Sequence, residues 1–139
     1  MALVVIAVFL FRGKDKDPVS VYILLASALL LLAELVVRSV RIGFVAVTNT
    51  YEWLVFFSAA IMIILSVGRL AFRDLFRPVI LFGGTVVAVA LLAIASSPIA
   101  PDAVMPPIPA LQSHWLVLHV TFAFIGEAFF AVAFISAIE

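Results

Sequence analysis

Cysteine is absent from this chain of 139 residues, and charged residues are scarce at 12%. The lack of thiols excludes disulfide bonds, thiolate metal sites and cysteine nucleophiles. Lysine and arginine together number eight, as do aspartate and glutamate, so the formal net charge is zero. The sequence therefore has no basic surface of the kind that binds nucleic acid, and nucleic acid is excluded as a partner.

Hydrophobic residues dominate what is present, at 67% of the chain with a mean hydropathy of +1.37. Apolar runs of helical length follow one another, which is typical of an integral membrane protein. The sequence has no alternating strand pattern, and an open sheet would leave backbone groups unsatisfied in lipid. We therefore predict an all-α fold, a polytopic transmembrane helical bundle with about four full spans plus a short N-terminal helix.

Polar residues divide the chain into these segments. The first apolar segment, residues 2–11, rises only about 15 Å as a helix and is too short to span alone. It also lacks the basic start and cleavage site of a signal peptide. Full spans are predicted over about residues 18–41, 51–67, 79–95 and 114–139. We interpret residues 1–139 as a single membrane domain with outer loops at about 42–50 and 97–113.

The distribution of lysine and arginine predicts the orientation of the bundle. The first and third interhelical loops carry three basic residues each, the second carries two, and the proline-rich fourth carries none. By the positive-inside rule the first and third loops are cytoplasmic. The second and fourth loops then share the outer face, and His119 is expected just over one turn inside the outer membrane surface.

The only two histidines, His114 and His119, lie together in the segment PALQSHWLVLHV, where the proline-rich loop meets the last apolar helix. At about 100° per residue, a regular helix places His119 on an aromatic stripe and points His114 away from it. The stripe consists of Gln112, Trp115, His119, Phe122, Gly126 and Phe130. A neutral imidazole among aromatic side chains suits haem iron and a flat porphyrin. Alternatively, His119 bonds a neighbouring helix, Trp115 is an interfacial anchor and His114 is a surface residue.

Three elements in fixed order carry a resemblance to a known family. They are Arg38, then TNTYEWL at residues 48–54, then PALQS-x-WL-x-x-HV at residues 109–120. Over about residues 36–135 the chain resembles the front half of the CcsA/ResC-type cytochrome c biogenesis proteins, the haem-handling subunits of the system II cytochrome c synthase. The resemblance implies that His119 is the first of two external histidines that ligate haem iron, and that His114 occupies a variable position.

The resemblance also implies a function, partners and a location. Haem b would be presented at the outer face, where the two thiols of an apocytochrome Cys-x-x-Cys-His motif add across its vinyl groups. The implied partners are apocytochrome c, a CcsB/ResB-type membrane subunit and the remaining part of the haem-handling protein. The expected location is the cell inner (plasma) membrane, multi-pass, with His119 near the periplasmic or outer face.

Several family features are absent from this sequence. The tryptophan-rich external segment, the second external histidine and the histidine within the membrane would all lie beyond Glu139. We therefore interpret the chain as a fragment, a split subunit or a truncated reading frame that is incomplete alone as a cytochrome c synthase (haem lyase). Gly126-Glu127 also departs from the pattern expected in the final helix, and no catalytic residue is assigned.

The predicted cofactor-binding residues are His119, Trp115, Gln112, Arg38 and Arg41, with His119 as the axial ligand of the haem iron. Arg38 lies four residues after Glu34, which predicts a local ion pair, although Arg38 and Arg41 also suit haem propionates.

The remaining polar and small residues suggest mainly structural roles. Asn49 and Glu52 are expected to cap the helix that begins near Tyr51, and Gly83-Gly84 to allow close packing. Glu127 either bonds a missing partner helix or takes part in a proton or haem-propionate path.

Two alternative functions use the same residues. In the first, the chain is a small-solute transporter or half-transporter in which Glu34, Glu127 and His119 line a passage. In the second, it is a structural membrane subunit that only packs against other membrane proteins.

Overall fold

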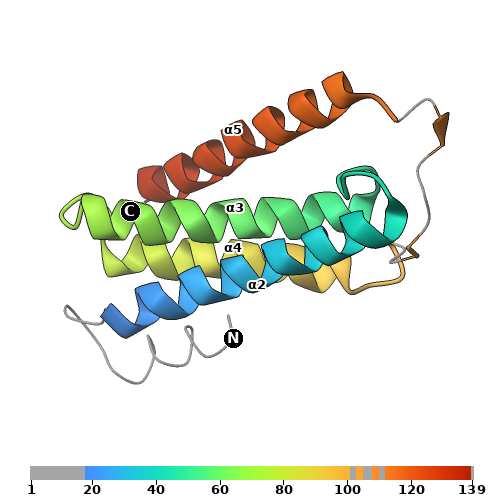
Figure 1. Cartoon of the computed structure of the whole chain (residues 1–139). Helices are drawn as coiled ribbons and strands as arrows, with labels where there is room; N and C mark the ends of the chain where they lie inside the picture. Colours follow the sequence, from blue (N-terminus) through green and yellow to red (C-terminus); the bar gives the residue numbers. More distant parts are fainter. Residues whose placement is uncertain (1–17, 101–102, 105–107, 110–111, 139) are drawn as a thin grey trace.

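Four long helices make up the computed structural model, which describes residues 18–100, 103–104, 108–109 and 112–138 (Figure 1). They are α2 (Pro18–Ile42), α3 (Thr50–Ala71), α4 (Pro78–Ala95) and α5 (His114–Ile138). All four are long and apolar enough to cross a membrane, and no strand occurs in the described part of the chain. The prediction of a polytopic helical bundle with four full spans is therefore confirmed. The short helix predicted over residues 2–11 lies outside the described residues.

Local sequence explains where the helices begin and end. After α2, Gly43 adopts a φ of +73° and its N–H donates to the Ser39 carbonyl at 2.9 Å, a left-handed ending that favours glycine. Asn49 is the N-cap of α3, and Pro78 opens α4, where its missing N–H leaves no helical bond unmade. The connections at residues 43–49 and 96–113 correspond to the two predicted outer loops.

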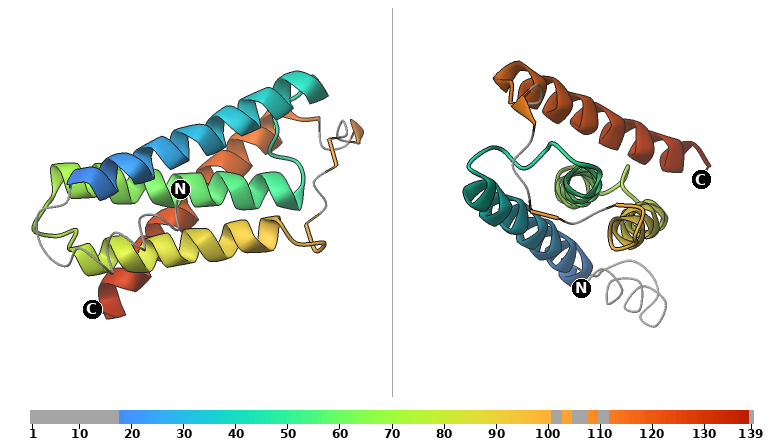
Figure 2. Two further views of the ribbon diagram at one scale, coloured as in Figure 1. Left: turned by 90° about the horizontal axis from the view of Figure 1, so that it is seen from below. Right: turned by 90° about the vertical axis from the view of Figure 1, so that its right-hand side faces the viewer.

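The central element of the bundle is α3, which packs against each of the other three helices. Seen end-on in Figure 2, α3 and α4 lie alongside each other, with α2 on one side and α5 on the other. Both α2 and α5 run obliquely to this central pair. Because α5 lies at the margin, none of the other described helices covers its far face.

The core is formed by apolar side chains from all four helices. Its fully buried members include Leu24, Ile61, Met62, Leu65, Ala88 and Ala128. Ser58, Ser66 and Thr85 are buried among them, and each hydroxyl donates to the carbonyl one turn earlier, at 2.7, 2.7 and 2.6 Å. These bonds satisfy polar groups that would otherwise be costly in an apolar interior.

Glycine allows close approach between helices in this core. A Cβ built on Gly84 would lie 2.5 Å from Leu65 Cδ1, and one on Gly83 would lie 2.8 Å from Ile135 Cγ2. Both distances are far below van der Waals contact, so a larger residue at either position would require Leu65 or Ile135 to shift. The predicted packing role of Gly83-Gly84 is confirmed.

The predicted outer loops meet at one end of the bundle. The end of α2, the start of α3, the end of α4 and the start of α5 all lie there, whereas the α3–α4 turn lies at the opposite end (Figure 1). Arg69, Arg73 and Arg77 belong to that opposite turn and its flanks. Among the described residues, the end that carries the histidines has two basic residues, Arg38 and Arg41, against these three at the opposite end.

Candidate functional site

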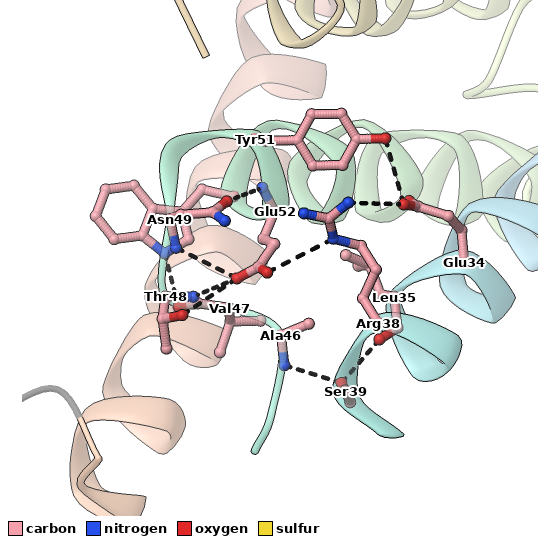
Figure 3. Close-up of polar contacts among 11 residues, drawn as sticks. Glu34, Leu35, Arg38, Ser39, Ala46, Val47, Thr48, Asn49, Tyr51 and Glu52 are labelled. Atoms are coloured by element: carbon pink, nitrogen blue, oxygen red, sulfur yellow. Dashed lines mark hydrogen bonds and ion pairs between the residues drawn. The ribbon is translucent and has the colours of Figure 1, made fainter. Parts of the chain in front are cut away.

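A cluster of charged side chains lies between α2 and α3 at the end of the bundle that carries the histidines (Figure 3). Arg38 is only 8% exposed, and its Nε is 3.6 Å from Oε1 of the fully buried Glu52. Its Nη1 is 3.7 Å from Glu34 Oε1, and its Cζ lies 4.6 Å from the centroid of the Tyr51 ring. The Tyr51 hydroxyl donates to Glu34 Oε1 at 3.3 Å, which closes the cluster. The predicted Glu34–Arg38 pair is confirmed.

Glu52 joins this cluster to the start of α3. Its Oε2 accepts from the Thr48 N–H at 2.8 Å, from the Asn49 N–H at 3.3 Å and from the Thr48 hydroxyl at 3.3 Å. In return, Asn49 Oδ1 accepts from the Glu52 N–H at 2.8 Å, which completes a capping box. The predicted capping by Asn49 and Glu52 is confirmed, and the same carboxylate also provides the buried counter-charge of Arg38.

The loop between α2 and α3, one of the two predicted outer loops, packs closely onto the helices. The Trp53 indole N–H donates to the Val47 carbonyl at 2.7 Å, and the Ala46 N–H donates to Ser39 Oγ at 2.8 Å. Ala46 and Val47 are buried. This loop is therefore a fixed surface at the end of the bundle that carries the histidines.

The contacts of Arg38 bear on its predicted role toward haem propionates. Two carboxylates and one aromatic ring already surround the guanidinium, so its charge is balanced within the chain. The geometry favours the structural role, in which Arg38 fixes α2 to α3. The sequence analysis did not predict the Arg38–Glu52 pair because the two residues belong to different helices. The signal that could have indicated the pair is their opposite charge, since Arg38 lies near the end of one predicted span and Glu52 near the start of the next.

The inner face of α5 is defined by its contacts with the bundle. Ala128 and Val132 are buried, and the Phe124 ring centroid lies 6.2, 6.4 and 5.9 Å from those of Trp53, Phe56 and Phe57. His119 lies nine residues before Ala128, about 180° around the helix. The face that carries His119 is therefore turned away from the bundle.

The predicted aromatic stripe forms this outward face from Trp115 onward. Trp115 is 81% exposed, and Phe122, Phe130 and His119 are exposed with it. Gln112 is also exposed but lies before the first turn of α5, so the helical stripe does not extend to it. The N–H of Gln112 donates to the Pro109 carbonyl at 3.2 Å.

His114 has a different environment from His119. Its ring packs edge-on against Phe44, with centroids 6.0 Å apart, and it borders an open groove of about 400 Å³ beside the end of α2. The other lining residues are Val36, Ser39, Val40, Gly43, Phe44 and Val45. The expectation that His114 points away from the stripe and is exposed at the surface is confirmed.

The remaining predicted site residues are exposed. Arg41 lies in the last turn of α2, and Glu127 lies near the middle of α5 on its outward half. Because Glu34 belongs to the α2–α3 cluster, whereas His119 and Glu127 face outward on α5, these three side chains do not line a common passage. This arrangement does not favour the transporter alternative.

The outward face of α5 offers one imidazole, that of His119, which does not line the groove beside the end of α2. Among the described residues, His119 has no hydrogen-bond or ring partner, and no group of three or more His, Cys, Asp or Glu side chains forms a metal site. A single imidazole provides too few ligands for a bare metal ion. It is sufficient as an axial ligand of haem, because the porphyrin supplies four nitrogens.

Comparison with known proteins finds no matching family model and no matching curated protein. The fold itself defines the class: this chain is a multi-pass, helical membrane protein with four candidate spans.

Proposed function

We propose that this chain is a haem-handling membrane protein of cytochrome c biogenesis that presents haem b at its outer face, with His119 as an axial ligand of the iron. The observation that supports the proposal is the position of His119 near the start of α5, the end predicted to face outward. It stands on an exposed aromatic face and has no partner within the described residues. The resemblance of residues 36–135 to the CcsA/ResC-type proteins is the second support.

The surroundings of His119 suit a large planar ligand. Trp115 is one turn before it and Phe122 is one turn after it on the same face, and both are mostly exposed. Aromatic side chains at these positions offer apolar surface to a porphyrin. His119 lies five residues into α5, about 7.5 Å below the start of the helix, so a porphyrin there reaches the outer membrane surface.

The polar groups near that surface are suited to the propionates. Arg41 is an exposed cation at the end of α2, and Gln112 is an exposed amide just before α5. A guanidinium binds carboxylates in a bidentate manner. Arg38 takes a positioning role instead: with Glu52 it fixes the outer loop and the start of α3, against which α5 packs through Phe124.

The chain contributes binding and orientation, and the bound haem supplies the vinyl groups to which apocytochrome thiols attach. An imidazole on the iron leaves the edge of the ring accessible. The absence of cysteine is compatible with this role because the thiols belong to the substrate. The proposed partners are apocytochrome c, a CcsB/ResB-type subunit and the remaining part of the haem-handling protein, and the proposed location is the inner (plasma) membrane with His119 toward the periplasm.

The proposal is tested by titrating haem b into the purified chain in lipid nanodiscs, with a purification tag that contains no histidine. We expect a Soret band that His119→Ala abolishes and added imidazole restores. His114→Ala is the matched control and should leave the band unchanged. Equal haem binding by wild type and His119→Ala, or a colourless wild type, would refute the proposal.

A further inference from the structure

The turn between α3 and α4 has an excess of positive charge. Over residues 69–77, three arginines stand against one acidic residue, Asp74, so the formal net charge of this stretch is +2. The opposite end of the bundle differs, because two carboxylates contact Arg38 there. The turn lies at the end of the bundle that is predicted to face the cytoplasm (Figure 1).

The side chain of Arg69 fixes the shape of this turn. Its Nη1 donates to the Arg73 carbonyl at 2.6 Å and to the Phe76 carbonyl at 2.8 Å. The Phe76 ring covers Gly68 so closely that a Cβ there would collide with it. The Phe76 N–H also donates to the Phe72 carbonyl at 3.0 Å. These contacts hold the backbone of the turn in a defined conformation.

Two other arginines and two apolar side chains are exposed on the turn. Arg73 and Arg77 are exposed, and Phe72 and Leu75 are 63% and 67% exposed. A surface of this composition binds a membrane interface in two ways, since the burial of apolar area and the attraction of cations to anionic lipid both contribute.

The lengths of the flanking helices place the turn at such an interface. At about 1.5 Å per residue, the 22 residues of α3 and the 18 residues of α4 extend about 33 and 27 Å. The hydrocarbon core of a bilayer is about 30 Å thick. Helices of these lengths end close to the edge of the core, so the turn that joins them lies among lipid headgroups.

We infer that this turn binds the headgroups of anionic phospholipids. Arg73 and Arg77 contact the phosphate groups, and Phe72 and Leu75 enter the boundary between headgroups and acyl chains. Charge complementarity favours anionic over zwitterionic lipid, because a cation near an anionic membrane surface is stabilised. A guanidinium also matches the geometry of a phosphate, to which it donates two parallel hydrogen bonds. The exposed apolar pair and the depth of the turn favour a lipid over a water-soluble acidic protein.

Quenching of tryptophan fluorescence by brominated lipids tests the contact at the turn itself. Phe72→Trp in a Trp53→Phe/Trp115→Phe background places the only tryptophan there and keeps an aromatic side chain at this position. The haem-free chain is reconstituted in bilayers of phosphatidylcholine and phosphatidylglycerol, of which one or the other is brominated. We expect both lipids to quench the tryptophan, and phosphatidylglycerol to bind beside it more strongly than phosphatidylcholine.

Substitutions of exposed arginines test the charges. Arg73→Gln should lower the preference for phosphatidylglycerol about 5-fold, the factor expected for one cation near an anionic surface. Arg73→Lys keeps the charge and should retain most of the preference. Arg41→Gln is the matched control, because it removes an exposed cation from the opposite end of the bundle, and it should leave the preference at the turn unchanged. Among the described residues, only the backbone carbonyl of Arg73 takes part in the hydrogen bonds of the turn, so circular dichroism should show unchanged helices.

The contrary results are distinct from one another, and each overturns the inference. Equal binding of the two lipids beside the tryptophan would mean that the turn does not select anionic headgroups. A tryptophan that neither lipid quenches would place the turn in water, where its partner is a soluble anion or an acidic protein. An unchanged preference in Arg73→Gln, or an equal loss in Arg73→Gln and Arg41→Gln, would mean that the arginines of the turn are not the binding groups.

Discussion

Removal of the Glu52 carboxylate is the perturbation that tests the α2–α3 cluster most severely. In Glu52→Ala, Arg38 stays buried but loses the nearer of its two counter-charges, and the more exposed Glu34 remains. The start of α3 also loses three accepted hydrogen bonds. Removing one partner of a buried ion pair costs about 3–5 kcal/mol, and losing a helix cap costs about 1 kcal/mol. Because Glu34 and Tyr51 still contact Arg38, we expect a total near the lower end, about 3 kcal/mol.

The measurement is unfolding in mixed micelles of increasing sodium dodecyl sulfate content, followed by Trp53 fluorescence in a Trp115→Phe background. The Trp53 indole reports on this region because it donates to Val47 in the outer loop. Asn49→Ala is the matched control and removes only the cap, at about 1 kcal/mol. The double variant Arg38→Leu/Glu52→Ala should be more stable than Glu52→Ala alone, because no unbalanced charge remains. If Glu52→Ala costs no more than Asn49→Ala, the ion pair is energetically unimportant and the reasoning is wrong.

Three further predictions concern packing and orientation. Gly84→Val should destabilise the bundle by about 1–3 kcal/mol in the same unfolding assay, because the valine side chain would collide with Leu65. Gly126→Ala is the control, and it should leave the free energy of unfolding unchanged or slightly higher. Gly43→Ala should cost about 1–2 kcal/mol because of the positive φ at that position, and equal stability of this variant and wild type would contradict a left-handed ending of α2. Single cysteines at Val45 and Ala103 should react with an impermeant maleimide from outside intact cells, and one at Asp74 only after permeabilisation; the reverse pattern would invert the predicted orientation.

The helices were the part of the structure that sequence patterns predicted best. A bilayer imposes a minimum length on an apolar span, and backbone groups in lipid must bond within their own helix, so composition alone restricts the fold. Boundary signals such as Pro18, Asn49, Pro78 and Gly43 are local and act through the backbone of neighbouring residues. The capping box of α3 was predictable for the same reason, whereas the close packing at Gly83-Gly84 was predicted from the small size of these residues.

The side-chain environments of the candidate site were less predictable. The pairing of Arg38 with Glu52 depends on how α2 and α3 pack, which no local pattern encodes. The periodicity of α5 showed that Trp115, His119 and Phe122 share a face, but not whether that face is directed inward. Its direction depends on which side of α5 fits against α3, and Phe124, Ala128 and Val132 occupy that position.

The outward direction of this face determines what surrounds the proposed haem ligand. Among the described residues, neither His119 nor Glu127, which both lie on the outward half of α5, has a hydrogen-bond or ion-pair partner. The Arg38–Glu52 cluster supports the site indirectly by holding the outer loop and the start of α3 in place.

The central claim is that the imidazole of residue 119 binds haem iron, and pulsed electron paramagnetic resonance tests it most directly. The chain contains two histidines, so a His114→Ala variant retains His119 as its only imidazole. This variant is grown with ¹⁵N-labelled histidine and loaded with unlabelled haem b in nanodiscs. We predict a ¹⁵N hyperfine coupling to the ferric iron that unlabelled protein lacks. A haem-loaded sample without ¹⁵N coupling would show that the iron is held by another ligand, and would contradict the account.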